Sequence, residues 1–236
     1  MTRYAEFTRS EKSAIKRWSH ATRFQVALRA LQPLDCQSLL DFGTADAEMI
    51  RIIKQAHPGV SCVGYDPHLD DGASDVLAAY PDVELATSLT ALVGRKFDIV
   101  TCFETLEHFG PQVVQLRVDE IIALAKPEGR VVVSVPIEIG PASLFKSAVR
   151  AAIGKPHPGT SAAGVLAGLF AQPVRRPAEK AGGYISSHIG FDYRTIPGLF
   201  SARGWQRDRT LYSPVGLAGP LFNSQVLFVF KRTAAQ

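Results

Sequence analysis

The chain has 236 residues, 46% of them hydrophobic and 20% charged, and its formal net charge is +4. A globular chain of this length buries roughly 70% of its unfolded surface in one core, so we expect a single domain over residues 1–236. The composition excludes the strong basic or acidic character that would demand an oppositely charged partner.

From the sequence we expect neither a cleaved signal peptide nor a membrane-spanning helix. The first six residues are mixed and polar, unlike a signal peptide. The longest weakly polar run, residues 161–174, contains glycine and proline and is too short to span a bilayer. The three cysteines lack Cys-x-x-Cys spacing, which indicates small buried thiols in a reducing compartment. We therefore expect a cytoplasmic protein, with peripheral contact at a membrane surface as an added role considered below.

The chain begins with a predicted helix. Apolar side chains recur at helical spacing over residues 10–31, from Trp18 to Leu31, and Pro33 ends the pattern. The opposite face carries lysines and arginines, which is typical of a solvated helix face. We assign residues 1–34 to this N-terminal helix.

The next stretch predicts a strand, a tight turn and a helix. Residues 38–42 are mostly apolar, Gly43 follows them, and a helix is expected to begin near Ala45. Glycine permits a backbone conformation and a close ligand approach that a side chain would block. In open α/β folds, small ligands bind at such turns on the carboxyl edge of a parallel sheet.

The chemistry of this turn narrows the choice of ligand. A dinucleotide site has the pattern Gly-x-Gly-x-x-Gly, but here Gly43 is followed by Ala45 and Glu48 at the other two glycine positions. Asp46 and Glu48 also place carboxylates in the first helical turn, where they would repel a phosphate. A ligand with a cationic centre and a ribose fits better, which describes S-adenosylmethionine (SAM).

Two further strand ends contribute to the predicted cofactor site. Residues 60–65 form a strand followed by Asp66 and Pro67, so Asp66 stands where an acidic residue binds ribose hydroxyls in such folds. A turn aspartate before proline is the structural alternative, and the two-strand context favours ribose binding. Ser88 follows a short strand at 83–86, where an adenine contact and a plain turn are equally expected.

The remainder of the first half alternates helices and strands, which predicts a parallel sheet. Helices are expected at 73–80 and 111–125, strands at 97–102 and 130–135, and a turn at 126–129.

Residues 136–190 break this alternation. The segment is basic, rich in glycine and proline, and too long for an ordinary connection, with two short helices expected at 142–153 and 162–170. We interpret it as a cap over the acceptor site, either a lid that excludes water, which we favour, or a membrane contact. After it we expect a helix at 194–202 and strands at 205–212 and 225–230.

Residues 41–47 and 64–67 resemble the first two motifs of the class I SAM-dependent methyltransferases, although that family prefers glycine at Ala45 and Ala47. The resemblance covers most of the chain except the insert. It implies an α/β, Rossmann-like fold with a mostly parallel seven-stranded sheet and a last antiparallel strand, carrying here an N-terminal helix and a helical insert after strand five. The residues and the resemblance together predict SAM contacts from Asp41, Gly43, Ala45, Asp66, Pro67, Ser88 and Phe103.

A second stretch, residues 97–108, resembles the ubiquinone-pathway O-methyltransferases, and its Glu-x-x-Glu-His sequence also occurs in small-RNA 2′-O-methyltransferases. The resemblance implies a divalent metal held by Glu104, Glu107 and His108, with His188 in the place of a further histidine. Carboxylates suit Mg²⁺ or Mn²⁺, and imidazoles favour Mn²⁺, Fe²⁺ or Zn²⁺. Two alternatives stay open at even odds: these residues act directly, with His108 as a general base where no metal binds, or they only order the loop.

These observations predict a methyltransferase that acts on a hydroxyl of a small molecule, a glycan or a lipid-linked precursor, with Glu104, His108 and His188 as its catalytic candidates. The alternatives are an RNA 2′-O-methyltransferase and a SAM-binding protein without catalysis. Few aromatic residues in the insert offer stacking surfaces, so nucleic acid is not the expected partner.

Overall fold

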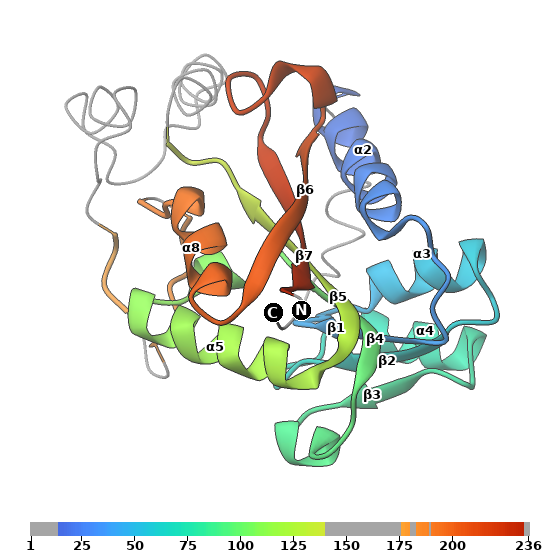
Figure 1. Ribbon diagram of the computed structural model, residues 1–236. Helices are drawn as coiled ribbons and strands as arrows, with labels where there is room; N and C mark the ends of the chain where they lie inside the picture. The colour runs from blue at the N-terminus through green and yellow to red at the C-terminus, as the bar shows by residue number, and fades with distance from the viewer. Residues whose placement is uncertain (1–13, 140–175, 180–182, 189, 234–236) are drawn as a thin grey trace.

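The computed structural model describes residues 14–139, 176–179, 183–188 and 190–233, and the helices expected at 142–153 and 162–170 lie outside them. Figure 1 shows the arrangement of the described elements. In chain order the helices and strands are α2 (Ala14–Leu31), β1 (Ser38–Phe42), α3 (Glu48–Ala56), β2 (Ser61–Tyr65), α4 (Gly72–Ala79), β3 (Glu84–Ala86), β4 (Phe97–Phe103), α5 (Pro111–Leu124), β5 (Ala125–Pro136), α8 (Ile196–Ser201), β6 (Trp205–Ser213) and β7 (Gln225–Arg232).

The strands form one seven-stranded sheet in the order β3-β2-β1-β4-β5-β7-β6. The first five strands are parallel, and β7 pairs antiparallel with both β5 and β6. The chain therefore reverses its direction of travel across the sheet between β1 and β4, which is the switch point where open α/β sheets bind ligands. The predicted sheet with a last antiparallel strand is confirmed.

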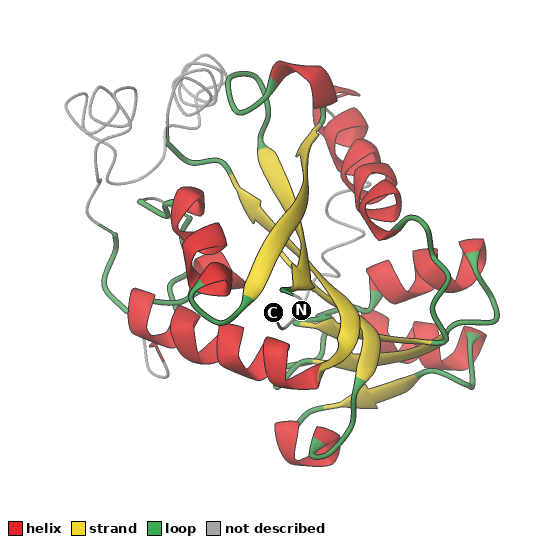
Figure 2. Ribbon diagram, in the orientation of Figure 1, coloured by secondary structure: helices red, strands yellow, loops and turns green. Residues whose placement is uncertain are grey.

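Helices cover both faces of the sheet, as Figure 2 shows. One core contains α5 and α8, with Val118, Ile121 and Phe200 packed against the strands. The other contains α2, α3 and α4, with Ile50 and Ile53 of α3 fully buried. Strands covered on both faces must be apolar throughout, which is why β5 carries an almost unbroken run of valines. Within the described residues, no helix is long and apolar enough to span a membrane.

Two local predictions differ from the structure. The turn expected at 126–129 lies within β5, because Ala125 pairs with Phe97 and the next pair joins Arg130 to Ile99. The intervening residues form an irregularity in the strand rather than a turn before it. The helix expected at 194–202 starts as a 3-10 turn, Tyr193–Thr195, before α8.

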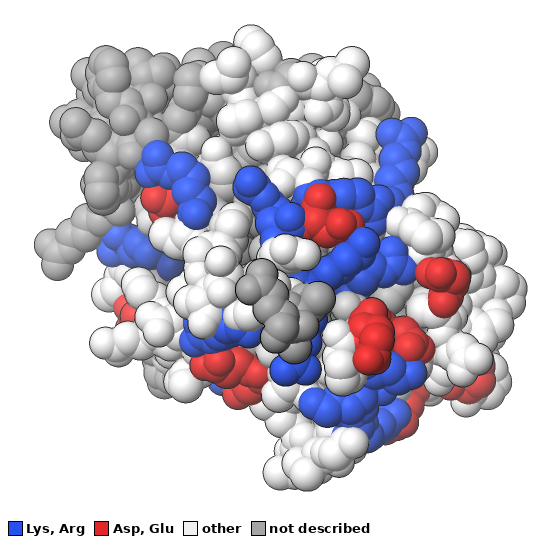
Figure 3. Space-filling model, in the orientation of Figure 1, with Lys and Arg blue, Asp and Glu red and all other residues white. Residues whose placement is uncertain are grey.

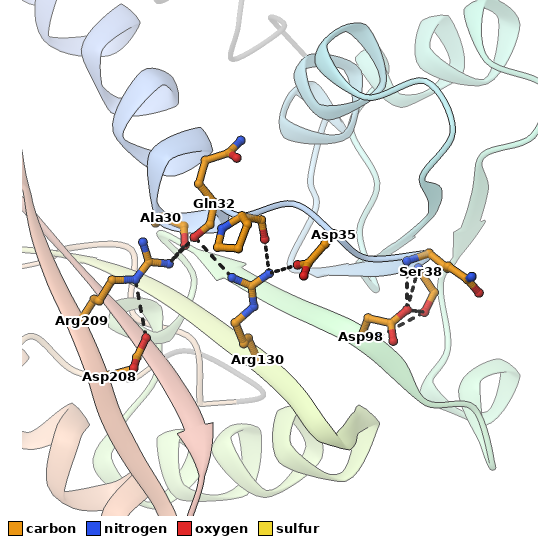
Figure 4. A network of polar contacts seen from close by, with 10 residues as sticks. Ala30, Gln32, Asp35, Ser38, Asp98, Arg130, Asp208 and Arg209 are labelled. Carbon is orange, nitrogen blue, oxygen red and sulfur yellow. Dashed lines mark hydrogen bonds and ion pairs between the residues drawn. The ribbon is translucent and has the colours of Figure 1, made fainter.

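Two arginines from the sheet bind the carboxyl end of α2 (Figure 4). Arg209 of β6 donates to the carbonyl oxygens of Ala30, at 2.8 Å, and Gln32, at 2.7 Å. Arg130 of β5 donates to the carbonyls of Gln32 and Pro33. The last carbonyls of a helix have no partner inside it, and cationic side chains also favour this negative end of the helix dipole. This network attaches α2 to the sheet.

We expect Arg209→Ala to lower the free energy of unfolding by about 1–2 kcal/mol, because it leaves a largely buried helix-end carbonyl without a donor. Urea denaturation measures the loss. Arg207→Ala is the matched control, since Arg207 lies on the same strand with an exposed side chain. Equal losses in the two variants would contradict the role of Arg209.

Candidate functional site

The turn between β1 and α3 adopts three left-handed backbone conformations. Gly43 has φ 84°, Ala45 φ 48° and Ala47 φ 56°. The left-handed region costs a residue with a side chain roughly 1–2 kcal/mol, so both alanines occupy conformations that suit glycine. A Cβ added at Gly43 would lie 2.3 Å from Thr105 Oγ1. Because Gly43 has no side chain, Thr105, which lies just after the end of β4, can pack directly against the turn.

Asp66 connects the ends of β1 and β2. Its Oδ2 accepts the backbone N–H of Ala45 at 3.1 Å, and its Oδ1 accepts the N–H of His68 at 2.8 Å. Burial raises the pKa of Asp66, and these two donors act in the opposite direction. Asp66 therefore has the structural role expected of a turn aspartate, because it accepts backbone N–H groups from both turns. Each carboxylate oxygen keeps a second lone pair that can accept a ribose hydroxyl, so ribose binding stays a prediction.

Asp41 lies inside the sheet near the end of β1. It is buried and accepts the Thr101 hydroxyl at 2.7 Å. Burial raises the pKa of Asp41 to about 6, and the hydrogen bond from Thr101 limits the rise. Through Thr101, Asp41 connects the end of β1, two residues before Gly43, to the neighbouring strand β4.

The other cofactor candidates also follow strands at this edge. Ser88 caps the 3-10 turn Leu89–Leu92 by accepting the N–H of Thr90, which is the plain turn role, and an adenine contact stays a prediction. Pro67 is exposed beyond β2, and Phe103 ends β4 half-buried.

Glu104 adopts a left-handed conformation, with φ 50°, immediately after β4. Its Oε1 accepts the side-chain amide of Gln225 at 2.9 Å, and its Oε2 forms an ion pair with Arg23 of α2 at 3.0 Å. Its backbone N–H donates to Ser134 of β5. These contacts draw the Glu104 carboxylate toward α2, β5 and β7.

Three of the predicted metal ligands converge. Glu107, His108 and His188 each place one ligand atom within 4.8 Å of the other two, and Glu104 is outside this set. His108 Nδ1 lies 3.0 Å from the carbonyl oxygen of Ile185. If Nδ1 donates this bond, Nε2 keeps its lone pair for a proton or a metal. The His108 ring stacks on Tyr184 at 5.2 Å and meets the edge of His188 at 4.9 Å.

Glu107 is fully buried, and neither of its carboxylate oxygens has a hydrogen-bond partner among the described residues. Burial raises the pKa of Glu107 well above its usual value, and the charge of Glu104 raises it further. An unpaired buried carboxylate is costly, so it must bind either a proton or a cation. With two imidazoles adjacent, the donor set fits a divalent cation.

Arg176 was not identified from the sequence. Its guanidinium donates to the carbonyls of Phe109, at 2.7 Å, and Glu107, and it lies 5.3 Å from the centre of the Phe191 ring. It therefore holds the backbone on both sides of His108. The only sequence signal was the general basic character of residues 136–190.

The seven-stranded sheet of this order, the left-handed glycine turn after β1 and the acidic residue after β2 agree with the resemblance to the class I SAM-dependent methyltransferases. The sequence agrees: residues 9–153, more than half of the chain, match the family described as Methyltransferase domain, and the chain belongs to that family. It is thus a SAM-dependent methyltransferase. None of the curated protein sequences matches the chain.

Several solved structures share the fold. Magnesium protoporphyrin IX methyltransferase from Synechocystis PCC 6803, with bound SAH (S-adenosylhomocysteine), aligns with TM-score 0.59 and 17% identity over 95% of this chain and 90% of that one. The 1,6-didemethyltoxoflavin-N1-methyltransferase of Burkholderia thailandensis gives TM-score 0.61 and 16% identity over 97% and 86%. Mitomycin 7-O-methyltransferase gives 0.58 and 18% over 93% and 56%. At these identities the likeness establishes the fold alone.

The buried carboxyl of Asp41 should make stability depend on pH. Its pKa is about 6 in the folded protein and about 3.8 when exposed, so the folded state holds the proton more tightly and wild-type stability falls as pH rises from about 4 to 6. Asp41→Asn removes this dependence. We expect the variant to gain about 3 kcal/mol relative to wild type between pH 4 and pH 8, measured by urea denaturation.

Asp98→Asn is the control of opposite sign. Partial burial raises the pKa of Asp98, but hydrogen bonds from Lys126 and Ser38 outweigh it and lower the pKa to about 2. Asp98 therefore stabilises the fold above pH 4, and this contribution is lost as pH falls toward 2. Parallel pH profiles for the two variants would contradict the assignment of Asp41.

Proposed function

We propose that this methyltransferase transfers the methyl group of SAM to a hydroxyl of a small molecule, a glycan or a lipid-linked precursor. The observation that carries the proposal is the cluster of Glu107, His108 and His188. Glu107 and His108 follow β4 just after Thr105, which packs against the Gly43 turn. A hydroxyl must lose its proton to become a good methyl acceptor, and this cluster contains groups that bind protons or cations.

We assign the cofactor to the carboxyl ends of β1 and β2. The remaining lone pairs of Asp66 suit two ribose hydroxyls, and the left-handed turn at Gly43 and Ala45 leaves the strand end without bulky side chains. Bound there, SAM supplies a methyl group on a cationic sulfonium. The carboxyl groups of Asp41, which is buried, and of Asp66, which is half-buried, favour that positive charge.

For a divalent metal we propose Glu107, His108 and His188 as the ligands, with Glu104 in a supporting role because Arg23 and Gln225 bind its carboxylate. A divalent ion supplies Lewis acidity that lowers the pKa of an acceptor hydroxyl. Where no metal binds, His108 accepts the acceptor proton at Nε2, with its ring oriented by the Ile185 carbonyl and by Tyr184.

The acceptor class has indirect support. Two proteins of similar fold are named for small-molecule acceptors, one methylated at oxygen and one at nitrogen. Nitrogen acceptors seldom need deprotonation to the same degree as hydroxyls, so the buried acid and two histidines favour oxygen here. An RNA 2′-O-methyltransferase and a SAM-binding protein without catalysis are the alternatives, and a lid function for residues 136–190 stays a prediction.

Asp66→Ala tests the cofactor site. Loss of charge-assisted bonds to the ribose, about 1.5–3 kcal/mol each, should weaken SAM binding by at least tenfold in calorimetry. Glu84→Ala serves as the control, because Glu84 lies on the neighbouring strand β3 in an exposed ion pair with Arg95. Unchanged SAM affinity in Asp66→Ala would place the ribose elsewhere.

The reaction is tested by turnover after exhaustive chelation, using His108→Ala, Glu107→Gln and Glu104→Ala. With a metal, chelation abolishes activity, a divalent ion restores it, and Glu107→Gln weakens metal binding measured by calorimetry. With His108 as the base, activity survives chelation and His108→Ala lowers kcat by about 10²–10⁴-fold.

Full activity in the His108→Ala and Glu107→Gln variants would remove the cluster from the mechanism and leave positioning of the acceptor as the main source of rate. Incubation of a cell extract with labelled SAM, followed by mass spectrometry, identifies the acceptor. Labelled RNA would favour the RNA alternative.

A further inference from the structure

The loop between β6 and β7 exposes a group of apolar side chains. We call Val215, Leu217, Leu221 and Phe222 the apolar tip. Leu217 is fully exposed and Phe222 is 70% exposed, with Val215 and Leu221 each near half. Single exposed apolar residues are common on protein surfaces, but four within eight positions form a patch that calls for a partner.

The loop that carries the apolar tip is internally fixed by Asn223. This buried side chain accepts the N–H of Val215 at 2.6 Å and donates to the carbonyls of Val215, at 2.9 Å, and Gly219, at 2.7 Å. All three bonds close the loop on itself. These hydrogen bonds fix the loop in the conformation that exposes Leu217 and Phe222.

Charged groups are missing from this part of the sequence. Residues 210–230 contain no lysine, arginine, aspartate or glutamate. In Figure 3 the surface at the top of the view, where β6 and β7 join, carries neither basic nor acidic colour. Transfer of the loop into an apolar layer would therefore desolvate no side-chain charge.

The apolar tip lies at the same edge of the sheet as the candidate site. Both β5 and β6 pair antiparallel with β7, so β6 runs parallel to β5 and ends at the carboxyl edge. Gln225, the first residue of β7 after the loop, donates to the Glu104 carboxylate. The loop and the site are thus adjoining parts of one edge.

We infer that the apolar tip inserts into the outer layer of a lipid bilayer. Four residues on one loop are too few for a stable interface with a second copy of the chain, which takes roughly 20–30 residues on each side. A short, uncharged, apolar projection suits insertion to the depth of the headgroup boundary. Insertion would turn the carboxyl edge of the sheet toward the membrane. If the proposed function holds, on which this step rests, the acceptor would be the lipid-linked one.

Co-sedimentation with phosphatidylcholine vesicles tests the inference, comparing the full chain with the double variant Leu217→Ser, Phe222→Ser. We expect the wild type to bind the vesicles, with little change in binding between low and high salt. The double variant should bind roughly tenfold more weakly, because it lacks the apolar area that Leu217 and Phe222 would bury in the bilayer. Leu116→Ser is the matched control, since Leu116 is 59% exposed but lies on α5, along a face of the sheet.

Three results would overturn the inference. They are equal vesicle binding by the wild type and the double variant, no binding by the wild type, and a wild-type dimer in light scattering that the double variant loses. The last would assign the apolar tip to a second copy. If another part of this chain covers the apolar tip, the wild type fails to bind and the double variant loses thermal stability.

SAM calorimetry on the same variants separates this inference from the proposed function. Unchanged SAM affinity in the double variant shows an intact site, so that loss of vesicle binding reports on the loop alone. Vesicle binding by the wild type together with no methyl transfer to any hydroxyl would leave the docking surface standing and remove the proposed reaction.

Discussion

The close contact between Gly43 and Thr105 is the constraint on which the site depends. A side chain at Gly43 would collide with the Thr105 hydroxyl, so the turn after β1 and the turn after β4 can meet only because glycine stands there. Sheet topology makes β1 and β4 neighbours, and this contact brings their loops together as well. The Gly43 turn and the short helix Leu106–His108 then share one edge of the sheet. This is the arrangement that the proposed methyl transfer would need, because donor and acceptor must be held in line.

Two buried acids at this edge impose a cost on the fold. Asp41 is stabilised by the Thr101 hydroxyl, and the pKa of its carboxyl still rises to about 6. Glu107 has no hydrogen-bond partner for its carboxylate among the described residues, and burial raises its pKa well above the usual value. Clusters of carboxyls with raised pKa are typical of functional sites, where a cationic ligand offsets the cost of burial. A sulfonium near Asp41 and a proton or cation at Glu107 would each do so.

The sequence predicted most of the fold because the relevant signals are local. Apolar strands, Gly43 and the alternation of helices and strands each appear within a few consecutive residues. The irregularity in β5 was missed because a lysine–proline–glutamate–glycine sequence is typical of a turn, whereas β5 already pairs with β4 at Ala125, before this sequence, and again from Arg130, after it. Sheet pairing overrides local preference there.

The site was only partly predictable for the opposite reason. The spacing of Glu104, Glu107 and His108 suggested one cluster, but Glu104 is bound by Gln225, 121 positions away along the chain, and by Arg23 of α2. Arg176 likewise reaches the backbone of Phe109 from 67 positions away. No local pattern encodes these contacts.

The separation of Glu104 from the cluster affects what the cluster can do. Four protein ligands would close a tetrahedral site and favour a structural metal. With a metal bound as proposed, the three ligands Glu107, His108 and His188 would leave a coordination position for an acceptor oxygen, as catalytic sites do. The Glu104 carboxylate, outside this set, is bound instead by Arg23 and Gln225. The N-terminal helix, fixed to the sheet by Arg130 and Arg209, therefore helps to position the Glu104 carboxylate through Arg23.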